Sequence, residues 1–136
     1  MKFKILSLML LSLIGATSVK NGDDAPLFNL LNQDDQTVSL EQFKGKKVVL
    51  EWTNHDCPFV KRHYDTGNMQ SLQKEMSDQD IVWLSIVSSA KGKQGYITND
   101  QAKELTNKRS AYPSHVLLDA EGSVGRMFSA KTTPHM

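Results

Sequence analysis

The stretch EWTNHDCPFVKRHY, Glu51 to Tyr64, contains the only cysteine of the chain and joins two different patterns. The run KVVLEWTN leads into it and is rich in β-branched and aromatic side chains, which is typical of a strand covered on both faces. After Cys57 the pattern becomes helical, and Pro58 stands where the first turn of a helix tolerates proline. The stretch therefore predicts a buried strand, a short polar turn and a helix that opens at Cys57.

This position favours a reactive thiol. The unpaired N–H groups and the dipole of a helix start stabilise an anion, and the thiolate is the reactive form of cysteine. Lys61 and Arg62 on the next turn add to the effect, whereas Asp56 either opposes it or caps the helix. The alternative is a structural thiol, because free cysteine is among the most buried residue types. Position alone leaves both interpretations open.

The rest of the chain alternates between strand-like and helix-like segments. Strands are predicted within residues 27–32, 37–40, 80–89 and 114–119, and one helical turn within 39–45. A second helical piece is expected to start at an Asn68 cap and to bury Met69, Leu72 and Met76. A third helix opens with the capping box of Thr98 and Gln101. This alternation predicts one α/β domain, with a mainly parallel sheet and helices on both faces.

The first 18 residues have the layout of a secretory signal peptide. Two lysines precede a 12-residue apolar run from Ile5 to Ala16, and small residues occupy the sites before a cleavage point at Ser18. The alternative is an uncleaved membrane anchor, but a spanning helix needs roughly 20 apolar residues. We therefore expect an exported, periplasmic or secreted protein that consists of residues 19–136 and does not insert stably into the membrane.

Charge and residue spacing exclude several classes of function. The formal charge is +1, and acidic and basic residues are mixed along the chain, so nucleic acid is not an expected partner. His55, Cys57 and His63 lack the paired spacing of zinc ligands, and no metal or other cofactor is predicted. A single cysteine cannot form a disulfide within its own chain. Trp52 and Trp83 are expected to pack in the core.

Three segments together resemble the redoxin group of the thioredoxin superfamily. They are GDDAPLFNLLNQDDQTVSLEQFKGKKVVLEWTNHDCPF, KGKQGY and LLDAEGSVGRMFSAKTTPHM, and the resemblance covers Gly22 to Met136. The group includes peroxiredoxins of the AhpC/TSA type and thiol-disulfide reductases. The resemblance implies a thioredoxin-like fold, Cys57 as the active-site cysteine, and Pro134 after Thr133 as a cis-proline that faces it.

Two positions depart from the family pattern. Val60 stands where a CxxC pair has its second cysteine, so dithiol exchange within the chain is impossible. Thr53 lies four residues before Cys57, whereas typical peroxiredoxins keep a threonine or serine three residues before it, at the position of Asn54 here. An asparagine amide can still donate a hydrogen bond to a peroxide.

The resemblance implies a peroxiredoxin-like enzyme with a single active cysteine. The Cys57 thiolate would attack a peroxide and become a sulfenic acid, which an external thiol reduces. The residues expected to orient the peroxide are Thr53, Asn54 and Arg126, and those expected to line the substrate cleft are Pro58, Thr133 and Pro134. The alternatives are a thioredoxin-like protein that exchanges disulfides with a partner, and a non-catalytic binding module.

The same resemblance predicts that the C-terminal part of the fold is missing. In the family a β-hairpin and a helix follow the cis-proline, whereas this chain stops two residues after Pro134. The strand that leads to Cys57 would then lie at an exposed sheet edge. Pro134 would lie in a loose tail with nothing to hold it against Cys57. We therefore expect either a truncated sequence or a protein of low stability.

Overall fold

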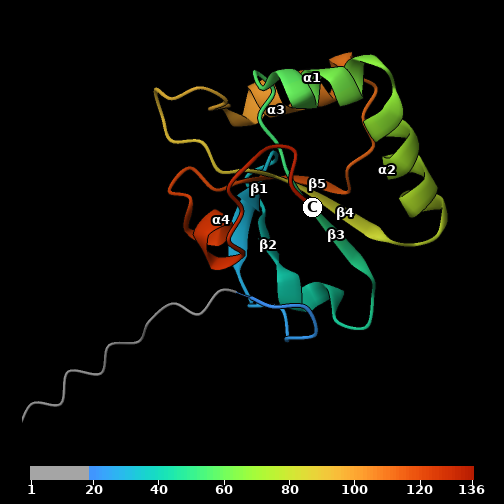
Figure 1. Cartoon of the computed structure of the whole chain (residues 1–136), viewed down its shortest axis with the longest axis vertical. Coiled ribbons are helices and arrows are strands. Elements are labelled where there is room, and N and C mark those ends of the chain that lie inside the picture. The colour runs from blue at the N-terminus through green and yellow to red at the C-terminus, as the bar shows by residue number, and fades with distance from the viewer. Residues whose placement is uncertain (1–18) are drawn as a thin grey trace, which may run out of the picture.

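The computed structural model describes residues 19–136, so the expected signal peptide lies outside the described part of the chain. Its centre is a mixed five-stranded sheet in the order β2-β1-β5-β4-β3 (Figure 1). The strands are β1 Asn29–Asn32, β2 Thr37–Ser39, β3 Val48–Trp52, β4 Val82–Val87 and β5 His115–Leu118. β3, β4 and β5 are parallel, whereas β1 runs antiparallel to both β2 and β5. The predicted α/β class is confirmed, and β3 lies at the predicted edge.

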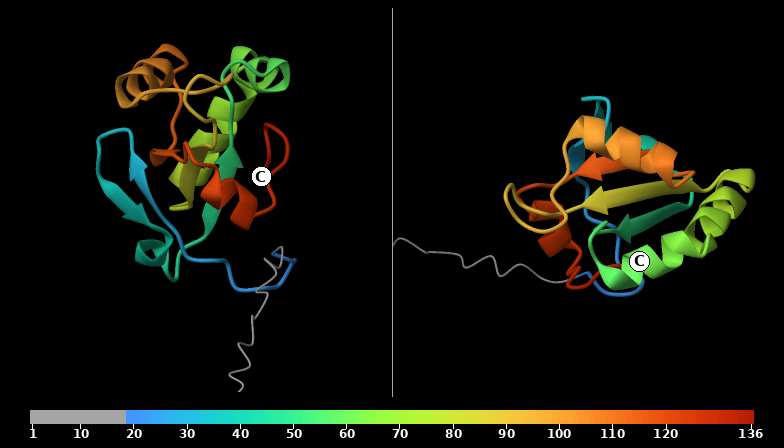
Figure 2. Two further views of the ribbon diagram at one scale, coloured as in Figure 1. Left: turned by 90° about the vertical axis from the view of Figure 1, so that its left-hand side faces the viewer. Right: turned by 90° about the horizontal axis from the view of Figure 1, so that it is seen from above.

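Five short helical elements accompany the sheet. They are η1 Leu40–Phe43, α1 Pro58–Asp65, α2 Asn68–Asp78, α3 Asn99–Lys108 and α4 Ser123–Met127. α4 lies on the opposite side of the strands from α2 (Figure 1), and Figure 2 shows the layers from two further directions. The predicted capping box at α3 is present: Thr98 accepts from the Gln101 amide, and the Gln101 side chain accepts from the Thr98 amide.

The alternation of side chains along β4 assigns the two faces, because neighbouring residues of a strand point to opposite sides. Leu84 and Ile86 are fully buried in the cluster that contains Val124 of α4. Trp83 points the other way, into a cluster with Val60 of α1 and Met69 of α2. Every residue of β4 is buried, as expected for a strand covered on both faces.

Two predictions about α2 are wrong. Its N-cap is Gly67, whose φ of 74° is easily adopted by glycine, and the Asn68 side chain instead contacts His63 at 2.8 Å. Leu72 is 39% exposed, whereas Gln73 beside it is fully buried. The helix is rotated in this way because the Gln73 amide takes part in a buried polar cluster beneath α1 and α2.

That cluster surrounds Glu51, which is fully buried in β3. Its carboxylate accepts hydrogen bonds from groups on three other elements. The donors are Tyr64 Oη at 3.0 Å, Gln73 Nε2 at 3.4 Å, Trp83 Nε1 at 2.9 Å and Ser85 Oγ at 2.8 Å. Burial and the neighbouring Glu51 carboxylate raise the pKa of Tyr64 far above its usual range, so its hydroxyl remains a donor. A buried carboxylate is tolerated only with such partners.

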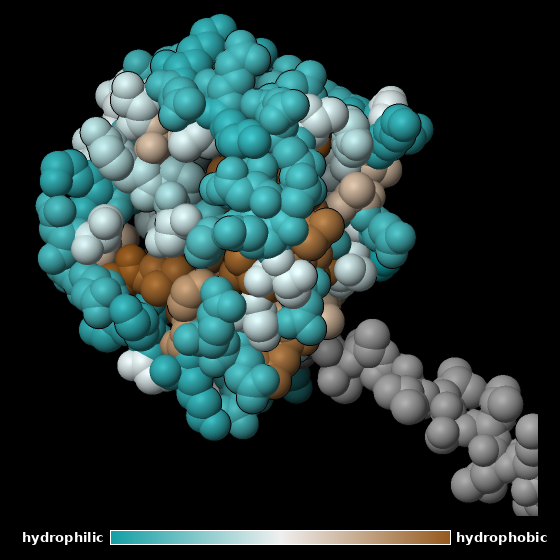
Figure 3. Space-filling view, turned by 180° about the vertical axis from the view of Figure 1, so that it is seen from behind, coloured by the Kyte–Doolittle hydropathy of each residue, from teal (hydrophilic) through white to brown (hydrophobic). Residues whose placement is uncertain are grey.

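The surface seen from behind is largely hydrophilic, with an apolar band across its middle (Figure 3). Large apolar side chains are also exposed elsewhere, and Phe59, which is 70% exposed, is two positions after Cys57. Within residues 19–136, no helix is long and apolar enough to cross a membrane.

We predict that Glu51→Leu destabilises the fold by about 3 kcal/mol or more, because it leaves several buried donors without an acceptor. Urea unfolding followed by tryptophan fluorescence measures the change. The matched control is Glu104→Leu at an exposed position of α3, which should change stability by less than about 0.5 kcal/mol. Equal effects of the two substitutions would contradict this role of Glu51.

Candidate active site

The turn between β3 and α1 presents Cys57 at the N-cap position of α1, as predicted. Two hydrogen bonds to Asn54 close this turn: its carbonyl accepts from the Cys57 amide at 3.0 Å, and its Oδ1 accepts from the Asp56 amide at 2.9 Å. Such side-chain-to-backbone bonds are typical of asparagine in turns. Of the two roles open to Asp56, capping of α1 is not observed: Cys57 is the N-cap, α1 has no side-chain cap bond, and the Asp56 carboxylate accepts from the Gly95 amide at 3.4 Å.

The segment around Pro134 lies directly against this turn. The Thr133–Pro134 peptide bond is cis, and Cys57 Sγ lies 3.2 Å from the Thr133 carbonyl oxygen. The residue after the proline forms an antiparallel bridge with β3, in which Trp52 N donates to His135 O at 2.8 Å and His135 N donates to Trp52 O at 3.2 Å. The expectation of a loose tail is therefore wrong, because the edge of β3 holds this segment in place.

Several contacts hold the pKa of Cys57 below its ordinary value. The largest cause is a hydrogen bond from the Thr133 side chain, followed by the backbone amide of Val60, and the amide of Phe59 adds to them. Partial burial acts in the opposite direction. The Thr133 carbonyl also favours the protonated thiol, since it can only accept a hydrogen bond. The lowering contacts prevail, so this environment enriches the nucleophilic thiolate.

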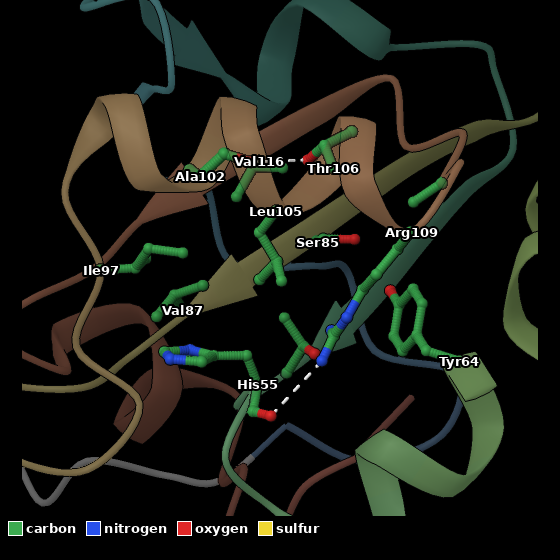
Figure 4. Close-up of a pocket in the computed structure, with 12 residues that line it drawn as sticks. His55, Tyr64, Ser85, Val87, Ile97, Ala102, Leu105, Thr106, Arg109 and Val116 are labelled. Atoms are coloured by element: carbon green, nitrogen blue, oxygen red, sulfur yellow. Dashed lines mark hydrogen bonds between the residues drawn. The ribbon is translucent and has the colours of Figure 1, made fainter.

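Two hollows lie on either side of Thr53. One is a cleft next to the turn that presents Cys57. It is lined by Cys57's contacts Asn54 and Thr133 but not by Cys57 itself, and its other lining residues are Trp52, Thr53, Ser88, Ser89, Ala130, Lys131 and Thr132. The other is a small cavity of about 40 Å³ between α1, α3 and the sheet (Figure 4). The Thr53 hydroxyl oxygen is buried and has no hydrogen-bond partner within residues 19–136. Among the residues predicted to orient the substrate, Thr53 is therefore the one whose side-chain hydroxyl is available to form a hydrogen bond.

Arg109 and Glu51 belong to the surroundings of the site but were missed by sequence reasoning. The Arg109 guanidinium stacks over the Tyr64 ring at 4.5 Å and donates to the His55 carbonyl at 3.3 Å, as Figure 4 shows. An arginine at the end of a helix is typical of an exposed position, so its sequence gives no signal. Glu51 has one signal, namely an acidic residue inside an otherwise apolar strand.

The predicted site residues do not all gather in one place. Thr53, Asn54 and Thr133 line the cleft beside Cys57, and Pro58 opens α1. Arg126 is exposed on α4 and donates to the Glu121 carbonyl at 3.0 Å, and it is not among the residues that line this cleft. Residues 19–136 contain no group of three or more His, Cys, Asp or Glu side chains placed to hold a metal ion.

Comparison with known proteins agrees with this architecture. Residues 21–136 match the AhpC/TSA family. A Haemophilus influenzae protein named "Putative peroxiredoxin bcp" is 28% identical over 113 residues, which cover 82% of this chain and 70% of that protein.

Two solved structures are similar as well. An uncharacterized conserved protein from Geobacillus kaustophilus is similar with a TM-score of 0.73 and 25% sequence identity. The match covers 83% of this chain and 59% of the Geobacillus chain. The exposed lipoprotein thioredoxin Etrx1 from Streptococcus pneumoniae is similar with a TM-score of 0.59 and 25% sequence identity. The match covers 80% of this chain and 77% of the Etrx1 chain.

The fold and the site define a thioredoxin-like protein with a single cysteine at a helix N-terminus beside a cis-proline. The chain belongs to the AhpC/TSA family. It spans about 59% of the length of the Geobacillus structure.

We predict that the pH midpoint for alkylation of Cys57 lies clearly below that of a free thiol, roughly 8.5. Thr133→Val should raise this midpoint, because it removes the hydroxyl that most lowers the pKa of Cys57 but keeps the branched shape. Rates with iodoacetamide across pH measure it. Thr132→Val is the matched control and should leave the midpoint unchanged. A parent midpoint at or above the free-thiol value would contradict a reactive thiol.

Proposed function

We propose that this protein is an exported peroxiredoxin-like thiol oxidoreductase that reduces peroxides with Cys57 and is regenerated by an external thiol. The observation that carries the proposal is the thiol itself: Cys57 opens α1, contacts Thr133, and has a lowered pKa. Membership of the AhpC/TSA family and the likeness to a protein named as a peroxiredoxin support the peroxide as the oxidant.

The reaction needs only the thiolate, a peroxide and two reducing thiols. The Cys57 thiolate attacks the terminal oxygen of ROOH; the S–O bond forms as the O–O bond breaks, and the alkoxide takes a proton and leaves as ROH. The resulting sulfenic acid condenses with one external thiol, which gives a mixed disulfide and water. A second thiol attacks that disulfide, releases the Cys57 thiolate and forms the oxidised thiol pair.

The surroundings of Cys57 suggest roles for the neighbouring residues. The cleft next to the Cys57 turn would admit the peroxide, and Thr133 lines it. Pro58 follows Cys57 at the start of α1, and Pro134 follows Thr133 after the cis bond. The buried Thr53 hydroxyl has no hydrogen-bond partner within the described part of the chain, and it would donate a hydrogen bond to a peroxide oxygen. Asn54 uses its side-chain oxygen to close the turn, so its role is to hold Cys57 in position. Arg126 does not line this cleft, and its guanidinium donates to the Glu121 carbonyl, so we propose that it does not orient the peroxide.

The position of Val60 explains why the reductant must be external. Val60 is fully buried on the inner face of α1, at the position where a CxxC protein has its second thiol. Cys57 itself is only partly buried, so a thiol from another molecule can reach it. We propose an exported location on the basis of the N-terminal pattern, and one solved neighbour is described as an exposed lipoprotein.

Thiol-disulfide exchange with a protein partner is the second candidate function. It is favoured by Phe59, whose side chain is 70% exposed next to Cys57 and offers an apolar contact for a partner. In this reaction the thiolate attacks a partner disulfide and releases one partner thiol, and a further thiol must then resolve the mixed disulfide.

We predict that Cys57→Ser abolishes peroxide consumption and leaves the fold intact, because a serine hydroxyl is not nucleophilic at neutral pH. Loss of hydrogen peroxide or cumene hydroperoxide is measured with dithiothreitol as the reductant, and circular dichroism checks the fold. Turnover by the variant comparable to the parent would place the chemistry elsewhere. If the parent consumes no peroxide but forms a Cys57-dependent mixed disulfide, exchange is the function.

A further inference from the structure

The loop that contains KGKQGY lies against the turn that presents Cys57, although about 40 residues separate them along the chain. The contact is made by Gly95, which is buried and has a φ of +83°. Its amide donates to the Asp56 carboxylate at 3.4 Å. A Cβ atom at this position would lie 2.5 Å from both Cγ and Oδ1 of Asn54 and 2.7 Å from its Nδ2. Any side chain at position 95 would therefore overlap with the Asn54 carboxamide.

The Asn54 side chain is not free to move aside. Its Oδ1 already accepts from the Asp56 amide at 2.9 Å, and its backbone carbonyl accepts from the Cys57 amide at 3.0 Å. Displacing the carboxamide would break the first bond and open the turn at the residue before Cys57. The Thr133 contact of 3.2 Å and the amides of the first turn of α1 would then no longer meet the sulfur in the same geometry.

We propose that Gly95 is a positioning residue for Cys57: the absence of a side chain lets the Asn54 carboxamide close the turn that presents the thiol. Gly95 thus acts through Asn54 and does not itself touch the substrate. The importance of this contact for turnover rests on the proposed function, whereas its effect on the reactivity of the thiol does not. The KGKQGY loop would then be a support of the active site.

The same loop provides a matched control. Gly92 has a nearly equal φ of +78°, but nothing lies within 4 Å of a Cβ placed there. Gly92→Ala therefore carries the strain of an alanine at positive φ without the clash. Gly95→Ala carries both, so any difference between the two variants measures the contact with Asn54.

The experiment measures alkylation of Cys57 by iodoacetamide at pH 7 and across the pH range. We expect Gly95→Ala to raise the midpoint by about one pH unit and to slow alkylation at pH 7 about tenfold, while Gly92→Ala leaves both unchanged. The ionisable groups on the segments around Cys57 are retained in every variant. They are His55, Asp56, Lys61, Arg62, Lys91, Lys93, Lys131 and His135. Equal alkylation of the two glycine variants would overturn the proposal.

A double-mutant cycle tests whether Gly95 acts through Asn54. Asn54→Ala should slow alkylation by itself, because the turn loses its side-chain bond, and adding Gly95→Ala should then have no further effect. A full Gly95→Ala effect without the Asn54 side chain would overturn the proposal. If Gly95→Ala alone does not fold, recovery of cooperative urea unfolding in the double variant supports the same contact, and no recovery contradicts it.

These measurements also separate this inference from the proposed function. Alkylation uses no peroxide and no reducing partner. A protein that fails to consume peroxide but shows the expected alkylation pattern would disprove the proposed activity and leave the role of Gly95 standing. Peroxide turnover that is equal in the parent, Gly92→Ala and Gly95→Ala would instead disprove the importance of Gly95 for turnover.

Discussion

The buried Glu51 carboxylate is the interaction on which the geometry of the site depends. Within residues 19–136, β3 is an edge strand, with β4 on one side and only the short bridge to His135 on the other. Glu51 joins it to α1, α2 and β4 through hydrogen bonds of 2.8 to 3.4 Å. Because Cys57 follows β3 by one short turn, fixing β3 relative to α1 also fixes where the thiol stands. Arg109 adds a second connection from α3, through its bond to the His55 carbonyl.

A second buried carboxylate organises the opposite side of the site. Asp119, at the end of β5, accepts from Ser88 Oγ at 2.6 Å and from the Gly125 amide at 2.9 Å. The Asp119 carboxylate thereby fixes the start of α4, because the unpaired amides at a helix N-terminus bind anionic groups favourably. The chain leaves α4 and returns to Trp52 through Thr133 and Pro134. The two segments that meet at Cys57 are thus each anchored by one buried carboxylate.

Much of this arrangement follows from local pattern, and the remainder depends on distant partners. The strand before Cys57, the helix after it and the capping box at Thr98 were predictable because each is determined by neighbouring residues. The burial of Gln73 in place of Leu72 was not, because its cause is Glu51, 22 residues away. The role of Gly95 was likewise not predictable, because its close approach to Asn54 forms only in the folded chain. The prediction of a loose C-terminal tail was wrong because no local sequence pattern at Trp52 or His135 indicates the bridge between them.

Thr133 links the position of the thiol to its reactivity. Its carbonyl contacts Sγ and favours the thiol form, whereas its side chain favours the thiolate and is the largest influence on the pKa of Cys57. The carbonyl of Thr133 thus opposes ionisation of Cys57, and its side chain promotes it. A site without a second cysteine cannot draw on a neighbouring thiol to lower the pKa of the first. Its reactivity depends instead on how accurately the Asn54 turn and the bridged Thr133 segment bring sulfur, hydroxyl and helix amides together.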